Sequence, residues 1–400
     1  MPQPLEGKRI VLGITGSIAS YKSLDLASKL VQANAQVDVI LTKGASKFIT
    51  PLSCRSLTHR PVITDLFDPE SELSVEHVAL AENADLVCVV PATAHVMAKV
   101  AHGLADDPLT TTILATKAPV MFAPAMDAHM YENVATQDNV ALLIKRGYNV
   151  FGPAWGHLAS GLMGRGRLLE TQDLLGYIKS VLGANGDLAG RTIVVSAGGT
   201  QEPIDPVRVI TNRSSGKQGY AIAEAARDRG ARAVLISASS LPSPAGIDTH
   251  QVSTVSQMRE AVLEACVGAD ALIMAAAVSD FRPAQVAQQK VKKNSDKMSL
   301  QLIKNADFFL EIPSGVLRVG FAAESEHLLD NARKKLRDKS LALIAANDIT
   351  APDSGFNVDS NRVTILDQEG GEEHLPVLSK YEVGNRILDR VKLYLRSKPS

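Results

Sequence analysis

The chain has 400 residues with 45% hydrophobic and 4% aromatic content, and its formal net charge is −1. This length favours two globular domains, and the balanced charge provides no whole-chain field that would attract nucleic acid or an anionic membrane. We expect no secretory signal and no membrane span, and three scattered cysteines without a CxxC pair fit a reducing cytoplasm rather than a disulfide framework or a structural zinc site.

The first half opens with a β-loop-α-β pattern. A strand over residues 9–13 leads into a loop rich in Gly, Ser and Thr, and a helix over 21–33 and a strand over 36–41 follow. Continuous apolar runs at 86–90 and 120–123 predict further strands that helices cover on both faces. The loop lacks the G-x-G-x-x-G pattern and the second strand ends without an acid, which disfavours an NAD(P)-dependent reductase.

Three more polar segments of the first half lie at residues 91–94, 105–107 and 124–131. Because open α/β sheets bind ligands at the carboxyl ends of their strands, we expect these segments and the first loop to border one crevice. His77 stands at the start of an apparent helix. Composition alone favours a capping or half-buried histidine at that position.

The second half opens in the same way, and its first loop is the most distinctive stretch of the chain. A strand over 192–197 precedes the segment GGTQEPIDPVRVITNRSSGKQG at 198–219, and a helix over 220–229 follows. Glycine amides and a helix N-terminus suit a phosphate group. Arg208 and Lys217 flank the same turn, which an elaborate helix cap would not explain. The segment therefore predicts a site for an anionic substrate.

Downstream apolar runs predict buried strands at 233–237, 271–275, 319–322 and 341–345. Asp280 follows one of these strands and by itself is equally compatible with a simple turn. Lys335 and Lys339 lie on one face of a helix, where they would form either an exposed basic surface or a clamp for phosphates.

We expect a linker at 182–190 and a loose Lys- and Gln-rich loop at 285–300.

Together these motifs resemble a known family. The first half is similar to flavoprotein decarboxylases that act on C-terminal or conjugated cysteine, and 198–219 is similar to phosphopantothenate–cysteine ligases. The two halves in this order resemble the bacterial bifunctional coenzyme A biosynthesis proteins. The resemblance implies an α/β chain of two Rossmann-like domains with mainly parallel sheets. It implies a flavodoxin-like, FMN-binding phosphopantothenoylcysteine decarboxylase at 1–185 and a CTP-dependent ligase at 186–400.

For the first half, the resemblance implies FMN as cofactor and His77 as a catalytic residue. The reaction it implies is oxidation of the cysteinyl thiol to a thioaldehyde, loss of CO2, and reduction and protonation of the resulting enethiol to give 4′-phosphopantetheine. The implied flavin contacts are Gly16, Ser17, Thr42, Pro91, Ala92 and Thr93.

Two catalytic positions of the first half depart from the family pattern. Asp127 stands where the family has asparagine, and an ionised carboxylate cannot donate a hydrogen bond to the substrate carboxylate. Ser160 stands where the flexible flap commonly carries a cysteine acid, and a hydroxyl is a much weaker acid than a thiol. The alternative to a working decarboxylase is a regulatory first half that binds FMN without turnover.

For the second half, the resemblance implies attack of the 4′-phosphopantothenate carboxylate on CTP, giving an acyl-cytidylate that cysteine then captures. Asn212 would hold the intermediate, Lys290 would act in the chemistry on a closing loop, and Asp280 would lie at the nucleotide or its Mg2+. The remaining implied substrate and CTP contacts are Arg208, Lys217, Ala275, Ala277, Ala306, Asp307, Phe308, Phe309, Phe321, Lys335 and Lys339.

The implied partners are small molecules, namely 4′-phosphopantothenate, cysteine and CTP, with neither nucleic acid nor a membrane. The resemblance also implies a homo-oligomer in the cytoplasm, with trimers of the flavin domain and dimers of the ligase domain.

Overall fold

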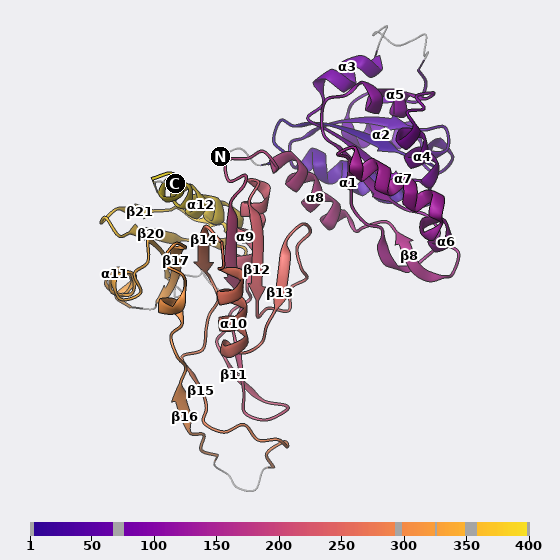
Figure 1. Cartoon of the computed structure of the whole chain (residues 1–400). Helices are drawn as coiled ribbons and strands as arrows, with labels where there is room; N and C mark the ends of the chain where they lie inside the picture. The colour runs from indigo at the N-terminus through magenta and orange to yellow at the C-terminus, as the bar shows by residue number, and fades with distance from the viewer. Residues whose placement is uncertain (1–3, 67–75, 293–297, 325, 349–357, 398–400) are drawn as a thin grey trace. The chain divides into compact units, whose positions relative to one another are not determined.

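The computed structural model describes residues 4–66, 76–292, 298–324, 326–348 and 358–397. The chain divides into two compact units, Met1–Gly183 and Ala184–Ser400 (Figure 1). Each unit is an α/β fold around a mainly parallel sheet, which confirms the predicted fold class. Within the described ranges, no helix combines the length and the apolar character that crossing a membrane requires.

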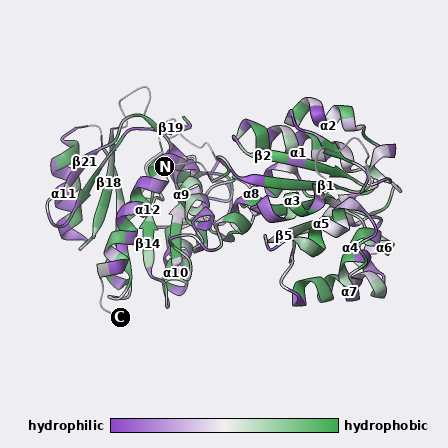
Figure 2. Ribbon diagram, turned by 90° about the horizontal axis from the view of Figure 1, so that it is seen from above, coloured by the Kyte–Doolittle hydropathy of each residue, from purple (hydrophilic) through white to green (hydrophobic). Residues whose placement is uncertain are grey.

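The sheet of the first unit is parallel and has the strand order β3-β2-β1-β4-β5-β6. Every residue of β4 and of β5 is buried, which explains why these strands read as continuous apolar runs. Figure 2 shows β1, β2 and β5 mainly in the hydrophobic colour. The strands are β1 (Arg9–Ile14), β2 (Gln36–Leu41), β3 (Val62–Ile63), β4 (Leu86–Ala92), β5 (Val120–Pro124) and β6 (Asn149–Val150).

Helices cover both faces of this sheet. Leu26 of α1 and Ile178 of α8 pack in one apolar cluster, and Met97 of α4 and Leu109 of α5 pack in another on the opposite face. The helices are α1 (Ser20–Gln32), α2 (Pro51–Thr58), α3 (Glu76–Asn83), α4 (Ala94–His102), α5 (Pro108–Ala115), α6 (Ala128–Glu132), α7 (Val134–Lys145) and α8 (Thr171–Gly183). A small antiparallel ladder joins β7 (Ala154–His157) to β8 (Met163–Arg167).

The sheet of the second unit has the order β13-β12-β9-β14-β17-β18-β20-β21. It is parallel as far as β18, and β20 and β21 extend it antiparallel. The strands are β9 (Thr192–Ala197), β12 (Arg232–Ser237), β13 (Asp248–Gln251), β14 (Ala271–Met274), β17 (Leu317–Glu324), β18 (Leu343–Asp348), β20 (Val363–Asp367) and β21 (Glu372–His374).

Helices again cover both faces. One apolar cluster includes Ile222 of α9 and Ile387 of α12, and another includes Met258 of α10 and Leu336 of α11. The helices are α9 (Lys217–Asp228), α10 (Val255–Ala265), α11 (Leu328–Asp338) and α12 (Lys380–Ser397). Short antiparallel ladders pair β10 (Gln201–Pro203) with β11 (Val209–Thr211), β15 (Phe281–Pro283) with β16 (Leu302–Lys304), and β19 (Ser360–Asn361) with β22 (Leu378–Ser379).

Several details differ from the sequence prediction. Two ladders that the sequence analysis does not predict lie beyond the end of the sheet in Figure 1. The β10–β11 ladder lies within the predicted loop at 198–219, and β15 and β16 flank the predicted loose loop at 285–300. The second half of the expected linker packs against the second unit, because Leu188 is 1% exposed in its core and Asp187 pairs with Arg229 and Lys392. Residues 293–297 of the expected loose loop lie outside the described residues.

The packing of α9 on β9 can be tested by a substitution at Gly219 of α9. A methyl group at this position would lie 2.7 Å from the carbonyl oxygen of Ser196 and 2.6 Å from the Cβ atom of Ala197. We expect Gly219→Ala to lower the free energy of unfolding by about 1–3 kcal/mol, although alanine favours helix. Urea titration of the full-length protein followed by circular dichroism measures this change.

The matched control is Gly315→Ala, because an added methyl group there meets nothing within 4 Å. We expect that substitution to change stability by less than about 0.5 kcal/mol. Equal stability of the two variants would contradict the close approach of α9 to β9.

Candidate functional site

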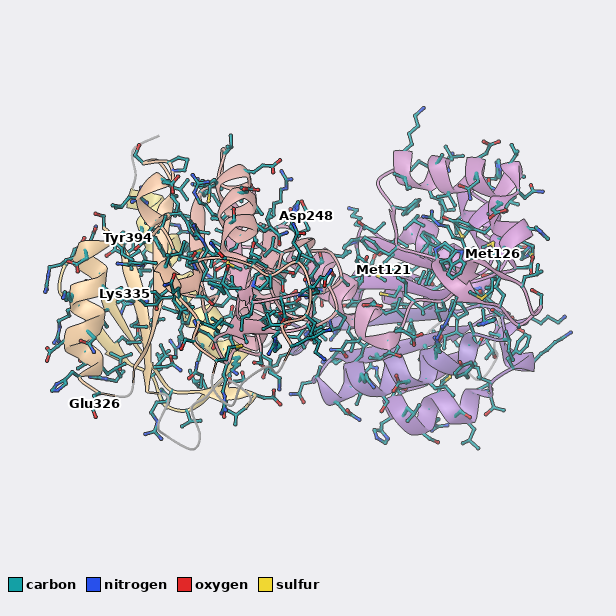
Figure 3. The ribbon with its side chains drawn as sticks, turned by 90° about the horizontal axis from the view of Figure 1, so that it is seen from below. Met121, Met126, Asp248, Glu326, Lys335 and Tyr394 are labelled. Carbon is teal, nitrogen blue, oxygen red and sulfur yellow. The ribbon has the colours of Figure 1, made fainter. Side chains whose placement is uncertain are left out.

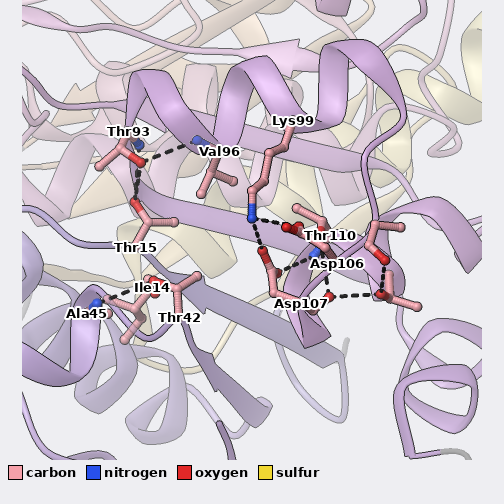
Figure 4. A network of polar contacts seen from close by, with 12 residues as sticks. Ile14, Thr15, Thr42, Ala45, Thr93, Val96, Lys99, Asp106, Asp107 and Thr110 are labelled. Carbon is pink, nitrogen blue, oxygen red and sulfur yellow. Dashed lines mark hydrogen bonds and ion pairs between the residues drawn. The ribbon is translucent and has the colours of Figure 1, made fainter. Parts of the chain in front are cut away.

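In the first unit, a hydroxyl network joins the carboxyl ends of β1 and β4. The Thr15 hydroxyl donates to the Pro91 carbonyl at 2.7 Å. It also accepts from the Thr93 amide at 3.1 Å (Figure 4). In the sheet, β2 lies on one side of β1 and β4 lies on the other side. The direction in which the chain adds strands therefore reverses between β1 and β4. Ligands of open α/β sheets bind at such a switch point. The predicted residues Pro91, Ala92 and Thr93 therefore lie at this end of the sheet.

The loops after β1 and β2 touch each other beside this network. A Cβ atom at Gly16 would lie 3.0 Å from the backbone of Gly44, which is tighter than most Cβ contacts, so a larger residue would push the two loops apart. The Thr42 hydroxyl donates to the Ile14 carbonyl at 3.3 Å (Figure 4). The loop containing Gly16 and Ser17 continues into α1, whose first turn has no side-chain cap. These groups suit the phosphate of a flavin mononucleotide.

The other predicted polar residues of this unit occupy neighbouring helix starts. Asp107 caps α5 by accepting from the Thr110 amide at 2.9 Å. Lys99 of α4 pairs with both Asp106 and Asp107, at 2.6 and 2.9 Å (Figure 4). His77 is half-buried in the first turn of α3.

Two of the predicted catalytic residues, Asp127 and Ser160, contact each other. Ser160 donates a hydrogen bond from its hydroxyl to Oδ2 of Asp127 at 2.6 Å, and Asp127 caps α6 by accepting from the His129 amide at 3.0 Å. These two donors hold the pKa of Asp127 below its usual value. Asp127 is therefore a carboxylate at neutral pH.

Backbone contacts hold the flap next to this pair. The flap is the β7–β8 hairpin with its connecting turn, which contains Ser160. The Met126 amide donates to the Gly166 carbonyl at 3.0 Å, and Figure 3 labels Met126 in this part of the first unit. The flap and the start of α6 thus place Asp127 and Ser160 together.

In the second unit, a cavity of about 700 Å³ involves the ends of β14 and β17 and the start of α9. It contains much of the substrate and nucleotide site predicted from the sequence. The predicted residues that line it are Asn212, Lys217, Ala275, Ala277, Asp280, Ala306, Asp307, Phe308, Phe309, Phe321, Lys335 and Lys339. The lining does not include two further predicted residues, Arg208 and Lys290.

Arg208 forms a clip between two loops instead. Its guanidinium binds the buried carboxylate of Asp205 and donates to the Val291 carbonyl at 3.0 Å. Asp205 also accepts from the Val291 amide at 3.2 Å, and Arg208 is the main reason that the pKa of Asp205 is strongly lowered. The clip ties the β10–β11 turn to the loop that carries the exposed Lys290.

At the wall of the cavity, Asn212 donates from its side-chain amide to the Val278 carbonyl at 3.2 Å and the Ala277 carbonyl at 3.5 Å. The loop after β14 is held against the loop after β9 by Thr200, which accepts from the Ser279 amide at 2.9 Å. A parallel bridge between Gly199 and Ala277 adds to this contact. The two loops of the strand-order reversal therefore form one continuous wall.

Another part of the cavity lining combines two lysines with aromatic residues. Lys339 pairs with Asp307 at 2.8 Å and lies 4.8 Å from the centre of the Phe309 ring. Lys335, which Figure 3 labels on α11, donates to the Phe321 carbonyl at 2.6 Å. Phe308 and Phe309 are almost fully buried, so their rings form the apolar floor of this end.

The sequence prediction missed several lining residues, including Asn347, Asn361 and Lys380. They lie far from the mid-chain motif, and no local pattern in the sequence marks them. The topology brings them in, because β18 is a neighbour of β17 and the β19–β22 ladder precedes α12.

The described residues contain no group of three or more His, Cys, Asp or Glu side chains that would hold a metal ion. Asp280 is an exposed carboxylate of the cavity lining. Mg2+ is commonly held by one or two carboxylates together with substrate phosphates. The residues present therefore fit a metal that arrives with a nucleotide better than a permanent metal centre.

Comparison with known proteins supplies the family. The family model described as "Flavoprotein" matches residues 1–183, and that of the "DNA/pantothenate metabolism flavoprotein C-terminal domain" matches 188–394. The coenzyme A biosynthesis bifunctional protein CoaBC of Vibrio parahaemolyticus is 43% identical over 397 residues, covering 98% of this chain and 99% of that protein. The CoaBC protein of Bacillus subtilis is 43% identical over 394 residues, covering 97% of each chain.

Among solved structures, the C-terminal domain of a CoaBC protein is 36% identical to this chain, with a TM-score of 0.46. The match covers 53% of this chain and 100% of that domain. The family models match both halves of the chain, and the relatives match it across nearly its whole length. The chain belongs to the family of coenzyme A biosynthesis bifunctional proteins.

Proposed function

We propose that this enzyme joins cysteine to 4′-phosphopantothenate with CTP and then decarboxylates the product to 4′-phosphopantetheine. Its family carries a decarboxylase and a ligase in one chain. The observation that supports the ligase most directly is the cavity of the second unit, where Asn212, basic side chains and an aromatic floor occur together. We assign the decarboxylase to residues 1–185 and the ligase to 186–400.

In the ligase, the carboxylate of 4′-phosphopantothenate attacks the α-phosphorus of CTP, and pyrophosphate leaves. The cysteine amine then attacks the acyl carbon of the cytidylate and CMP leaves, taking the bonding electrons of the broken bond. Both steps gather negative charge in one place. Lys217, Lys335 and Lys339 supply positive charge to balance it, and Asp280 holds Mg2+ that arrives with the triphosphate.

We assign the remaining residues of the ligase site by their positions and chemistry. Asn212 donates neutral hydrogen bonds to the acyl-cytidylate, and Phe308, Phe309 and Phe321 form the cytidine pocket with Asp307. Lys290 reaches the site on a loop anchored by the Asp205–Arg208 clip, from outside the cavity lining.

In the decarboxylase, the residues at the β1–β4 switch point hold FMN, with the start of α1 and Thr42 at its phosphate and residues 91–93 beside its ring. Bound FMN supplies the oxidation of the cysteinyl thiol and the return of the electrons after CO2 has left. His77 acts as a catalytic residue next to the reacting group. The flavin assignments rest on the loop contacts at the carboxyl ends of the strands, and the role of His77 rests on the family resemblance.

The last step of the decarboxylase needs a proton on the enethiol, and Ser160 is a poor source. Its hydroxyl donates to the Asp127 carboxylate, and this negative charge disfavours loss of the proton. Among the described residues of this unit, the cysteines are Cys54 and Cys88, and burial raises the pKa of both, that of Cys54 to about 11. Neither thiol replaces the family's flap cysteine.

The Asp127–Ser160 contact also supports a second candidate for the first unit, a regulatory flavin-binding unit without turnover. A carboxylate at position 127 repels the substrate carboxylate, and the flap lacks its acid. Product formation distinguishes the two candidates, whereas flavin absorbance does not.

We place the enzyme in the cytoplasm, where its buried, unbridged cysteines stay reduced. We also propose that it forms homo-oligomers, with trimers of the flavin domain and dimers of the ligase domain. Its substrates are small molecules, and its balanced net charge provides no attraction to nucleic acid or membranes.

The first prediction about the reactions concerns decarboxylation. Full-length, flavin-loaded enzyme releases CO2 from 4′-phosphopantothenoylcysteine, because FMN provides the oxidation that makes the carboxylate labile. Release of 14CO2 from carboxyl-labelled substrate measures this step. Flavin-loaded protein that releases no CO2, while still ligating cysteine, would establish the regulatory candidate instead.

The second prediction concerns the charge at position 127. We expect Asp127→Asn to lower KM for 4′-phosphopantothenoylcysteine roughly fivefold, since unit charges 4 Å apart in water repel by an amount of that size. Steady-state CO2 release measures KM. Asp138→Asn removes an exposed carboxylate from α7 as the control, and an equal effect of the two substitutions would refute the assignment.

The third prediction concerns Asn212. We expect Asn212→Ala to form the acyl-cytidylate but to slow its conversion by cysteine about 100-fold, which is typical for loss of a donor to a reacting oxygen. Quenched-flow chromatography of pyrophosphate and CMP separates the two steps. Asn331→Ala, which changes an exposed amide on α11 outside the cavity, serves as control. Normal CMP release by the Asn212 variant would remove this residue from the mechanism.

A further inference from the structure

Asn347, near the end of β18, places a side-chain amide at the wall of the cavity. The residue is 8% exposed and belongs to the cavity lining. Within the described ranges, its side chain makes no hydrogen bond to the protein. Every side-chain polar atom of those ranges that is buried away from solvent does have a partner, so the Asn347 amide reaches solvent, and the cavity provides it.

The other side-chain amides of the described cavity lining all donate to protein oxygens, as buried polar groups usually do. These amides are Asn212, Gln218, Asn305 and Asn361. They hold neighbouring loops and helix starts together. Asn347 differs from them, because its hydrogen-bonding capacity is left for a molecule in the cavity.

The strand pattern sets the face of the sheet to which Asn347 points. Side chains two residues apart on a strand point to the same face. Ala345, two residues before Asn347, packs in the apolar cluster that includes Ile222 of α9 and Ile387 of α12. Phe309 packs in the cluster of the opposite face, to which α11 belongs. Asn347 therefore points to the side of α9, away from the face of Phe309.

The two faces divide the proposed substrates between them. The nucleotide is assigned to the aromatic floor of Phe308 and Phe309 and to the lysines of α11, which leaves the side of α9 for the other substrate. An asparagine amide carries no charge and offers both a donor and an acceptor, so it suits a neutral polar group better than a phosphate. The chain of 4′-phosphopantothenate carries two such groups, one amide and one free hydroxyl.

We propose that Asn347 hydrogen-bonds the amide or the free hydroxyl of 4′-phosphopantothenate in the ligase site. The inference rests on the proposed ligase function and adds a residue that selects the acid substrate. A site that hydrogen-bonds a substrate group discriminates against an analogue that lacks this group, because the site's own polar group then stays unpaired.

The test measures KM by pyrophosphate release from the full-length enzyme, with each substrate varied in turn while cysteine and the other substrate are saturating. Asn347→Leu keeps the approximate size of the side chain and removes both its donor and its acceptor. We expect it to raise KM for 4′-phosphopantothenate about fivefold, as loss of one neutral hydrogen bond does. KM for CTP is expected to change by less than about twofold.

The matched control is Asn331→Leu, which removes an exposed amide of α11 outside the cavity lining. We expect it to change neither KM by more than about twofold. If Asn347→Leu misfolds by circular dichroism, Asn347→Ser takes its place, because a short hydroxyl side chain is tolerated in a hydrated cavity and is too short to replace the amide.

Two analogues of 4′-phosphopantothenate identify the contacted group. One has hydrogen in place of the free hydroxyl, and the other has an alkene in place of the amide. For the analogue that lacks the contacted group, the native enzyme and the Asn347 variant have the same KM within about twofold, because the two losses are not additive. For the other analogue, the fivefold difference remains.

The proposal is overturned by an unchanged KM for 4′-phosphopantothenate, by an increase confined to CTP or equal for both substrates, or by a difference that persists with both analogues. Each of these results leaves the ligase assignment intact. Absence of pyrophosphate release by the native enzyme would overturn the ligase assignment and this inference with it.

Discussion

Reversal of the strand order places both candidate sites. In the first sheet, β1 lies between β2 and β4. In the second sheet, β9 lies in the same way between β12 and β14. The chain segments that leave the two strands lead to opposite faces of the sheet, and ligands of open α/β sheets bind at the carboxyl ends where this happens. The Thr15 network and the wall formed by Thr200 and Ser279 lie at these two points.

The same geometry provides two different chemical environments. At the end of β1, hydroxyls, backbone groups and a close glycine contact suit a flavin phosphate. At the end of β9, lysines from α9, α11 and α12 converge on one cavity whose carboxylates include Asp280 and Asp307. Such an excess of positive charge favours transition states in which a triphosphate and a carboxylate approach each other.

Direct contact between Asp127 and Ser160 couples two residues that the sequence presents separately. Taken singly, an aspartate lacks the amide donor of an asparagine, and a serine lacks the acidic thiol of a cysteine. As a pair 2.6 Å apart, they stabilise the carboxylate and make the hydroxyl less acidic. The effects of the two residues are therefore coupled, and substitution of one changes the chemistry of the other.

Local patterns in the sequence predicted the parallel sheets, the mid-chain anion site and the family, because buried parallel strands are continuous apolar runs and a phosphate loop is contiguous. Asn212, Lys217 and the Phe308–Phe309 pair belong to short motifs of this kind. Only the tertiary structure brought in Lys380, whose neighbours Lys217 and Asp359 come from other segments of the chain. It likewise placed Arg208 against Asp205 and Ser160 against Asp127. Long-range contacts of this kind depend on the register of distant strands and on side-chain directions, which no local sequence pattern specifies.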